Sequence, residues 1–133
     1  MSQAQMQQVI ISEVGGPEKL AYETVTIPTA QAEEVLVKVH AFGINRPDIL
    51  QRQGLYPMPK DVTPVPGLEV AGEIVAVGAE VTQFKVGDKV CGLTNGGGYA
   101  EYCVVPASQT LVIPEGVSFT QAAAIPETFF TVW

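Results

Sequence analysis

Hydrophobic and polar residues alternate along much of this chain, with the two-residue period of half-buried β-strands. In residues 34–41, Val35, Val37 and Val39 share one face, and Lys38 lies on the other. Similar segments, separated by glycine, proline and aspartate, occur at residues 9–12, 20–27, 70–77, 89–93, 100–105 and 110–113. Short strands separated by turn residues predict a mainly β fold, a closed or partly closed antiparallel barrel.

Two short helices are expected to interrupt the strands. Pro47 suits a first helical position, and residues 48–53 can form about two turns before Gly54 ends them. Thr120 is the predicted N-cap of a second helix at residues 121–124. A further turn is expected to begin at Pro126.

Length and charge limit the classes of function. A chain of 133 residues suits one domain, and 14 acidic against 7 basic residues give a net charge of −7. This charge disfavours nucleic acid and anionic lipid as partners. The chain has no apolar run near the roughly 20 residues of a membrane span, and its polar start does not resemble a signal peptide. We therefore predict a cytoplasmic protein with no membrane partner.

Only two cysteines occur, Cys91 and Cys103, both in apolar strand-like sequence. This count does not indicate a disulfide framework. Both are interpreted as small buried hydrophobic residues.

The glycines and glutamate of residues 67–78 have the spacing of a zinc-alcohol-dehydrogenase fingerprint, but Leu68 stands where that pattern has its histidine ligand. An aliphatic side chain cannot bind zinc. With the motifs at residues 15–18, 45–56, 87–90 and 122–127, the chain resembles the medium-chain dehydrogenase/reductase superfamily. Within it, residues 45–56 look most like the zinc-independent quinone oxidoreductases. The resemblance implies a GroES-like barrel, no bound metal, NADPH as cofactor, a quinone-like substrate and a homo-oligomeric complete enzyme.

Asn45 and Asp48 are the first candidate site residues. The Asn45 amide can donate and accept hydrogen bonds at once, which suits a substrate carbonyl or the nicotinamide carboxamide. Its alternative role is a turn asparagine with an unusual backbone conformation. Asp48 can cap the helix or bind Arg46 or Arg52, and the resemblance puts it at the edge of the cleft.

Tyr56, Arg46 and Thr131 complete the candidate set. The resemblance implies that Tyr56 contacts the nicotinamide cofactor and borders the quinone pocket, since a planar ring suits a planar quinone. Its alternative is an ordinary loop tyrosine. Arg46 is either a solvated charge or a partner for a cofactor phosphate, and Thr131 either lies near the nicotinamide or is a plain helix residue.

Glu69 and His40 are two other polar residues, and neither is expected to act directly on a ligand. In zinc-binding relatives the glutamate matching Glu69 lies behind the metal, and here it is expected to pair with a basic group. His40 alternates outward from the valines, which argues against a catalytic role.

No G-x-G-x-x-G that opens a helix occurs, so this chain is not expected to contain a Rossmann domain. We interpret residues 1–133 as one GroES-like catalytic domain, cut before the nucleotide-binding domain and inactive alone. With no strong general acid, solvent is the expected proton donor. The alternatives are a metal-free enoyl reductase of the same superfamily and a non-catalytic GroES-like binding module.

Overall fold

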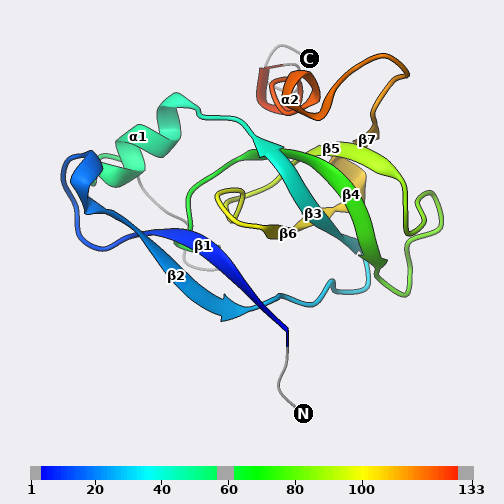
Figure 1. The fold of residues 1–133 in the computed structure, drawn as a ribbon, viewed down its shortest axis with the longest axis horizontal. Coiled ribbons are helices and arrows are strands. Elements are labelled where there is room, and N and C mark those ends of the chain that lie inside the picture. The colour runs from blue at the N-terminus through cyan, green and yellow to red at the C-terminus, as the bar shows by residue number, and fades with distance from the viewer. Residues whose placement is uncertain (1–3, 57–61, 129–133) are drawn as a thin grey trace.

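The computed structural model describes residues 4–56 and 62–128. These residues form a mainly β structure in which a curled sheet makes a partly closed antiparallel barrel (Figure 1), as predicted. A two-stranded sheet pairs β1 (Gln5–Ile11) with β2 (Leu20–Thr26). A five-stranded sheet has the order β6-β3-β4-β5-β7, with β3 Glu34–Phe42, β4 Glu69–Val77, β5 Lys89–Leu93, β6 Tyr102–Pro106 and β7 Thr110–Val112. Every pair of neighbouring strands is antiparallel.

The core lies inside the five-stranded sheet, where β3 and β4 pair at its centre. The alternating valines of β3 point into it, and Val35 and Val37 are almost completely buried. They pack with Val70, Ile74 and other residues of the neighbouring strands. The pairing shifts between Leu36 and Val37 and again between Val39 and Ala41, as expected for a strand that must bend around a barrel.

The strand predictions are confirmed with small shifts. The segment at residues 89–93 agrees with β5 at both ends, and the segments at 20–27, 34–41, 70–77 and 110–113 each differ by one residue at one end. β1 begins at Gln5 rather than Val9, because a polar stretch also pairs with β2. β6 begins at Tyr102, since Ala100 makes an isolated bridge with Gln8 instead.

Both short helices are present, and one cap differs from its prediction. α1 spans Arg46–Arg52, one residue earlier than expected, with Asn45 as N-cap. α2 spans Phe119–Ala122, two residues earlier than the expected 121–124, and is capped by Ser118, so the prediction of Thr120 as the cap is wrong. Ser118 is the N-cap because Gln121, three residues later, forms a capping box with it. Pro126 begins the helical stretch 126–128, as predicted.

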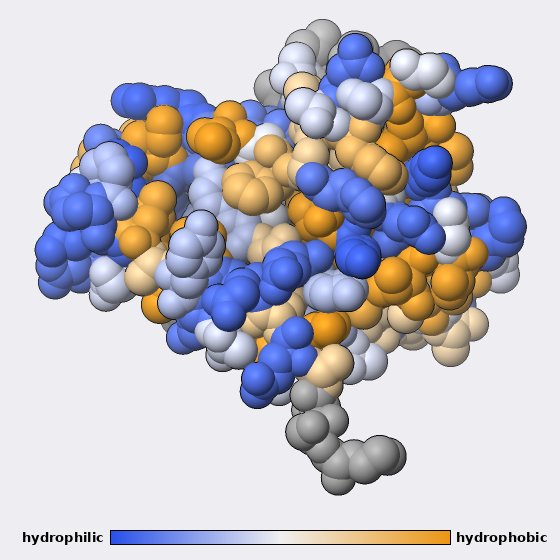
Figure 2. Space-filling view, in the orientation of Figure 1, coloured by the Kyte–Doolittle hydropathy of each residue, from blue (hydrophilic) through white to orange (hydrophobic). Residues whose placement is uncertain are grey.

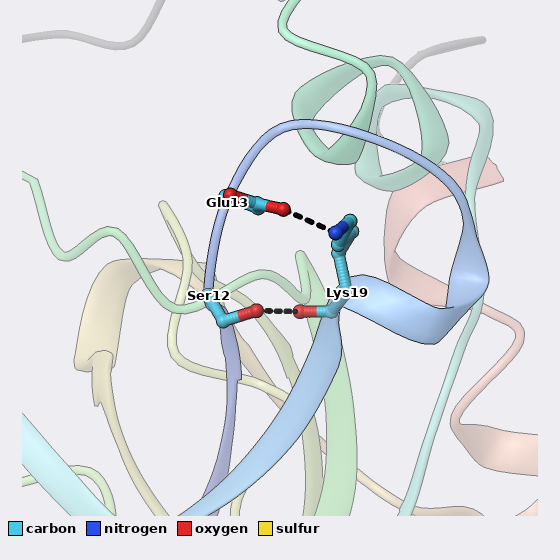
Figure 3. A network of polar contacts seen from close by, with 3 residues as sticks. All are labelled: Ser12, Glu13 and Lys19. Atoms are coloured by element: carbon cyan, nitrogen blue, oxygen red, sulfur yellow. Dashed lines mark hydrogen bonds and ion pairs between the residues drawn. The ribbon is translucent and has the colours of Figure 1, made fainter.

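The turn between β1 and β2 supports α1 from one side. Ser12 Oγ donates to the Lys19 carbonyl at 2.8 Å, and Lys19 Nζ pairs with Glu13 (Figure 3). Gly15 N–H donates to the Arg52 carbonyl at 2.9 Å, and Arg52 Nε donates to the Gly15 carbonyl at 3.1 Å. The end of α1 is therefore fixed against this turn.

Within residues 4–56 and 62–128, no helix is long and apolar enough to cross a membrane.

Candidate functional site

The site is built on the short connection between β3 and α1. Asn45 has extended backbone angles, φ −126° and ψ 159°, so the alternative of an unusual turn conformation is not found. Asp48 Oδ2 accepts the Asn45 backbone N–H at 3.0 Å, and the two residues stand in the capping-box arrangement. The predicted capping role of Asp48 is therefore confirmed.

The same carboxylate has a second partner that sequence reasoning missed. Tyr99 Oη donates to Asp48 Oδ2 at 2.8 Å, although the two residues are 51 positions apart. Asp48 is only 5% exposed, and burial together with the Asp48 carboxylate raises the pKa of Tyr99 well above its usual value. The Tyr99 ring also stacks on Phe42, with ring centroids 4.5 Å apart. A tyrosine after three consecutive glycines was the available signal, but its distant partner could not be identified.

The alternative of an ion pair between Asp48 and a neighbouring arginine is not supported. Arg46 is exposed, and Arg52 donates to the Gly15 carbonyl. Ion pairs in the described part of the chain join Lys19 to Glu13 and Lys85 to Asp88. Arg46 therefore stays a candidate for a phosphate, and Arg52 contributes to the packing of α1.

Glu69, the first residue of β4, lies on the other side of Asn45. Its Oε1 accepts a hydrogen bond from Asn45 Nδ2 at 3.0 Å, and its Oε2 accepts the Glu127 backbone N–H at 2.9 Å. The expectation that Glu69 pairs with a basic group is wrong, because amide N–H groups satisfy both oxygens. A chain of hydrogen bonds therefore runs from Tyr99 through Asp48, Asn45 and Glu69 to Glu127.

Beside α1 lies a cavity of about 290 Å³ that joins two of the candidate residues. Asp48 and Tyr56 line it together with Leu68, and the Tyr56 side chain is accessible, at 38% exposure. The remaining lining residues are Pro47, Gln51, Val62, Asn95 and Gly96. Asn45 is adjacent through the cap but outside this lining, Arg46 lies on the surface, and Thr131 lies outside the described residues.

The cavity has an apolar wall where a metal ligand would otherwise be expected. Leu68 faces it, and a leucine side chain offers no electron pair to a metal. In the part of the chain that the structure describes, no three histidine, cysteine, aspartate or glutamate residues cluster as a metal site would require.

Cys91 and Cys103 are buried free cysteines, as predicted. Burial raises the pKa of both thiols, to about 12 for Cys103, and the nearby Glu69 charge raises that of Cys91 further. His40 is exposed and stacks on the Phe119 ring at 4.2 Å, away from the cavity that Asp48 and Tyr56 line.

Comparison with known proteins gives a family and a group of similar proteins. Residues 31–115 match the model of the alcohol dehydrogenase GroES-like domain. The chain is 40% identical over 128 residues to a rat quinone oxidoreductase and 43% identical over 106 residues to a zebrafish synaptic vesicle membrane protein VAT-1 homolog. These alignments cover 95% and 80% of the chain but 39% and 22% of the two relatives.

Solved structures agree with this assignment. A quinone oxidoreductase from Pseudomonas syringae superposes with a TM-score of 0.84 at 39% identity, covering 96% of this chain and 39% of that one. The CurK enoyl reductase gives 0.84 at 33% identity, covering 96% and 40%. An Escherichia coli quinone oxidoreductase in complex with NADPH gives 0.77 at 32% identity, covering 89% and 36%.

Proposed function

Because the chain belongs to the alcohol dehydrogenase GroES-like domain family, we propose that it is the substrate-side domain of a zinc-independent NADPH:quinone oxidoreductase. The observation that carries the proposal is the cavity that Asp48 and Tyr56 both line, in a chain whose relatives include quinone oxidoreductases. The chain spans less than half the length of these relatives. We therefore propose that residues outside the match complete the nucleotide site.

The size of the cavity suits one ring of a quinone or nicotinamide. Its volume is about 290 Å³, close to the lower end of the range for ligand pockets, which begins at roughly 300 Å³. We propose that the Tyr56 ring forms a planar wall for such a ring, while Leu68 adds an apolar surface to the same lining. When bound, NADPH supplies the hydride.

Asn45 and Asp48 hold polar groups beside this cavity. We propose that the Asn45 amide orients a carbonyl or carboxamide, and that Asp48 fixes the loop carrying Asn45 by accepting its backbone N–H. Arg46, exposed at the start of α1, is available to a cofactor phosphate, and Thr131 is proposed to lie near the nicotinamide. Solvent is the proposed proton donor, because Asp48 already accepts two hydrogen bonds.

Substitution of Tyr56 tests the proposal. In the enzyme that carries this domain with its nucleotide-binding domain, we expect Tyr56→Ala to lower kcat/KM for 9,10-phenanthrenequinone roughly two- to twelvefold, the equivalent of about 0.5–1.5 kcal/mol of ring contact. Tyr22→Ala is the matched control, since Tyr22 is 81% exposed on β2 and lies outside this cavity. The melting temperature should change little in either variant. Equal kinetics for both variants would contradict the site assignment.

An enoyl reductase is the second candidate function. The structural similarity to the CurK enoyl reductase favours it, because that protein has the same domain fold and is named for the reduction of an enoyl substrate. Assays with a quinone and with a conjugated enoyl thioester separate the two: faster NADPH oxidation with the thioester would favour this alternative. If neither substrate is reduced, a non-catalytic binding module becomes the better interpretation.

The homo-oligomeric state, the cytoplasmic location and the exclusion of nucleic acid and membranes as partners stay predictions.

A further inference from the structure

A buried carboxylate at the start of β4 is the most unusual group near the site. Glu69 is only 3% exposed, and its strand is otherwise lined by valine, alanine, glycine and isoleucine at buried positions. Burial of a charged group costs free energy unless hydrogen bonds or an opposite charge compensate it. Within residues 4–56 and 62–128 no ion pair involves Glu69, so hydrogen bonds must compensate the charge.

The two oxygens of Glu69 serve two different segments. Oε1 accepts from the Asn45 side chain at 3.0 Å, just before α1, and Oε2 accepts from the Glu127 backbone at 2.9 Å. These donors lie 24 positions before and 58 positions after Glu69 in the sequence. One side chain therefore connects the candidate site to the helical stretch that begins at Pro126.

The chain makes room for this carboxylate at Gly43. A Cβ atom added at Gly43 would lie 2.0 Å from Glu69 Oε1, much closer than two such atoms can approach. Gly43 is not among the described glycines with positive φ, so its backbone conformation does not require glycine. The requirement is space, and the space is filled by Glu69. Gly43 N–H also donates to the Glu69 backbone carbonyl at 3.2 Å.

An ionised carboxylate only accepts hydrogen bonds, whereas an asparagine amide has one donating and one accepting end. If the Asn45 amide were flipped, its oxygen would face Glu69 Oε1 and the two would repel. The carboxylate therefore favours the orientation in which Nδ2 faces Glu69, and the same orientation leaves the amide oxygen toward the Asp48 backbone N–H in the capping box.

We propose that Glu69 is a positioning residue that holds the Asn45 amide in one orientation and so sets how a ligand carbonyl or carboxamide is held beside the cavity. This inference rests on the proposed function for the identity of the ligand. The orientation of Asn45 itself does not depend on that function.

The first test needs no activity. In ¹⁵N–¹H spectra of this chain, Glu69→Gln should shift the Asn45 side-chain NH₂ and Glu127 backbone N–H signals, because glutamine presents an NH₂ where one acceptor was. Glu73→Gln is the matched control, a half-buried glutamate on the same strand, and it should leave both signals in place. Gly43→Ala should displace the carboxylate without changing its charge and should shift the same two signals. Unchanged signals in both Glu69→Gln and Gly43→Ala would overturn the proposal.

The second test asks whether the orientation matters for the reaction. In the enzyme with its nucleotide-binding domain, Glu69→Gln should lower kcat/KM for a quinone roughly two- to tenfold, the loss expected for one hydrogen bond. Combined with Asn45→Ala, it should add almost nothing to the effect of Asn45→Ala alone, since both act through the same amide. A purely structural role would give additive losses, and such a result would overturn the proposal.

The two failures can be told apart. If Asn45→Ala slows quinone reduction and Glu69→Gln does not, the positioning role is wrong and the proposed function stands. If the wild-type enzyme does not reduce quinones, the proposed function is wrong, and the spectra alone decide whether Glu69 orients Asn45.

Discussion

At the scale of single residues, the two buried thiols show how strongly this barrel changes the chemistry of a side chain. Burial raises the pKa of Cys103 to about 12, and burial with the Glu69 charge raises that of Cys91. An unperturbed thiol loses its proton near pH 8.5. At neutral and mildly alkaline pH both residues therefore stay protonated in the folded chain, where a thiol is a weak nucleophile.

We expect neither thiol to react with 5,5′-dithiobis(2-nitrobenzoic acid) at about pH 8 in the folded chain, and both to react in concentrated guanidinium.

From about pH 8.5 upward the unfolded chain loses a thiol proton that folded Cys103 keeps, so the free energy of unfolding should fall as the pH rises. The loss should continue to about pH 12, the folded pKa of Cys103. Guanidinium unfolding at several pH values measures it. Cys103→Ala should show a shallower fall, and an identical slope would contradict this account.

One contact of the candidate site could be predicted from the sequence, and its long-range contacts could not. Asn45 and Asp48 are three positions apart at a helix start, so their capping contact follows from local spacing. The partners Tyr99 and Glu69 are 51 positions from Asp48 and 24 positions from Asn45. Hydrogen bonds over such separations depend on how the strands pair, and one sequence does not determine them.

At the scale of elements, α2 shows how much a very short helix depends on its cap. Its four residues lie between Ser118 and Ala123, so the helix has little more than one turn. Ser118 Oγ accepts the Gln121 N–H at 3.1 Å, and Gln121 Oε1 accepts the Ser118 N–H at 3.0 Å. The cap holds Ala122 and Ala123 against Ala71 and Cys91 in a small second core.

Ser118→Ala should lower the free energy of unfolding by about 0.5–2 kcal/mol, the usual cost of losing a serine cap. Thr120→Ala is the control, because Thr120 is an exposed residue inside the same helix, and alanine there should be neutral or slightly stabilising. Denaturant unfolding of both variants measures the difference. If Thr120→Ala destabilised the chain more than Ser118→Ala, the cap would belong to Thr120 after all.

The strands were more predictable than their ends, for a physical reason. Alternation identifies β3 because one of its faces is buried in the core, where apolar side chains are required. The first half of β1 is mostly glutamine and pairs in a hairpin with β2. The pattern of hydrophobic residues therefore does not predict a strand there. Ala100 belongs to an isolated bridge, which depends on the approach of β1 rather than on the local sequence.

At the scale of the whole molecule, charge and shape both limit what this chain can bind unaided. Its net charge is −7, and hydrophilic residues run along the β1–β2 hairpin, with hydrophobic patches elsewhere on the same face (Figure 2). Ile44 and Leu55, on either side of α1, are 72% and 68% exposed. The cavity of about 290 Å³ can hold a ring but not a dinucleotide.

These limits give a prediction for residues 1–133 alone. A dinucleotide phosphate carries several negative charges, which a chain of net charge −7 repels, and the cavity can engage only its nicotinamide end. We therefore expect calorimetry to give a dissociation constant for NADPH weaker than about 1 mM, which corresponds to about −4 kcal/mol. The same titration on the proposed complete enzyme, which would include a nucleotide-binding domain, is the control and should give much tighter binding. Because repulsion weakens the complex, added salt should not reduce the affinity of the isolated chain. Micromolar binding by residues 1–133 would show that this domain carries the phosphate contacts itself, and the proposed division of the site would be wrong.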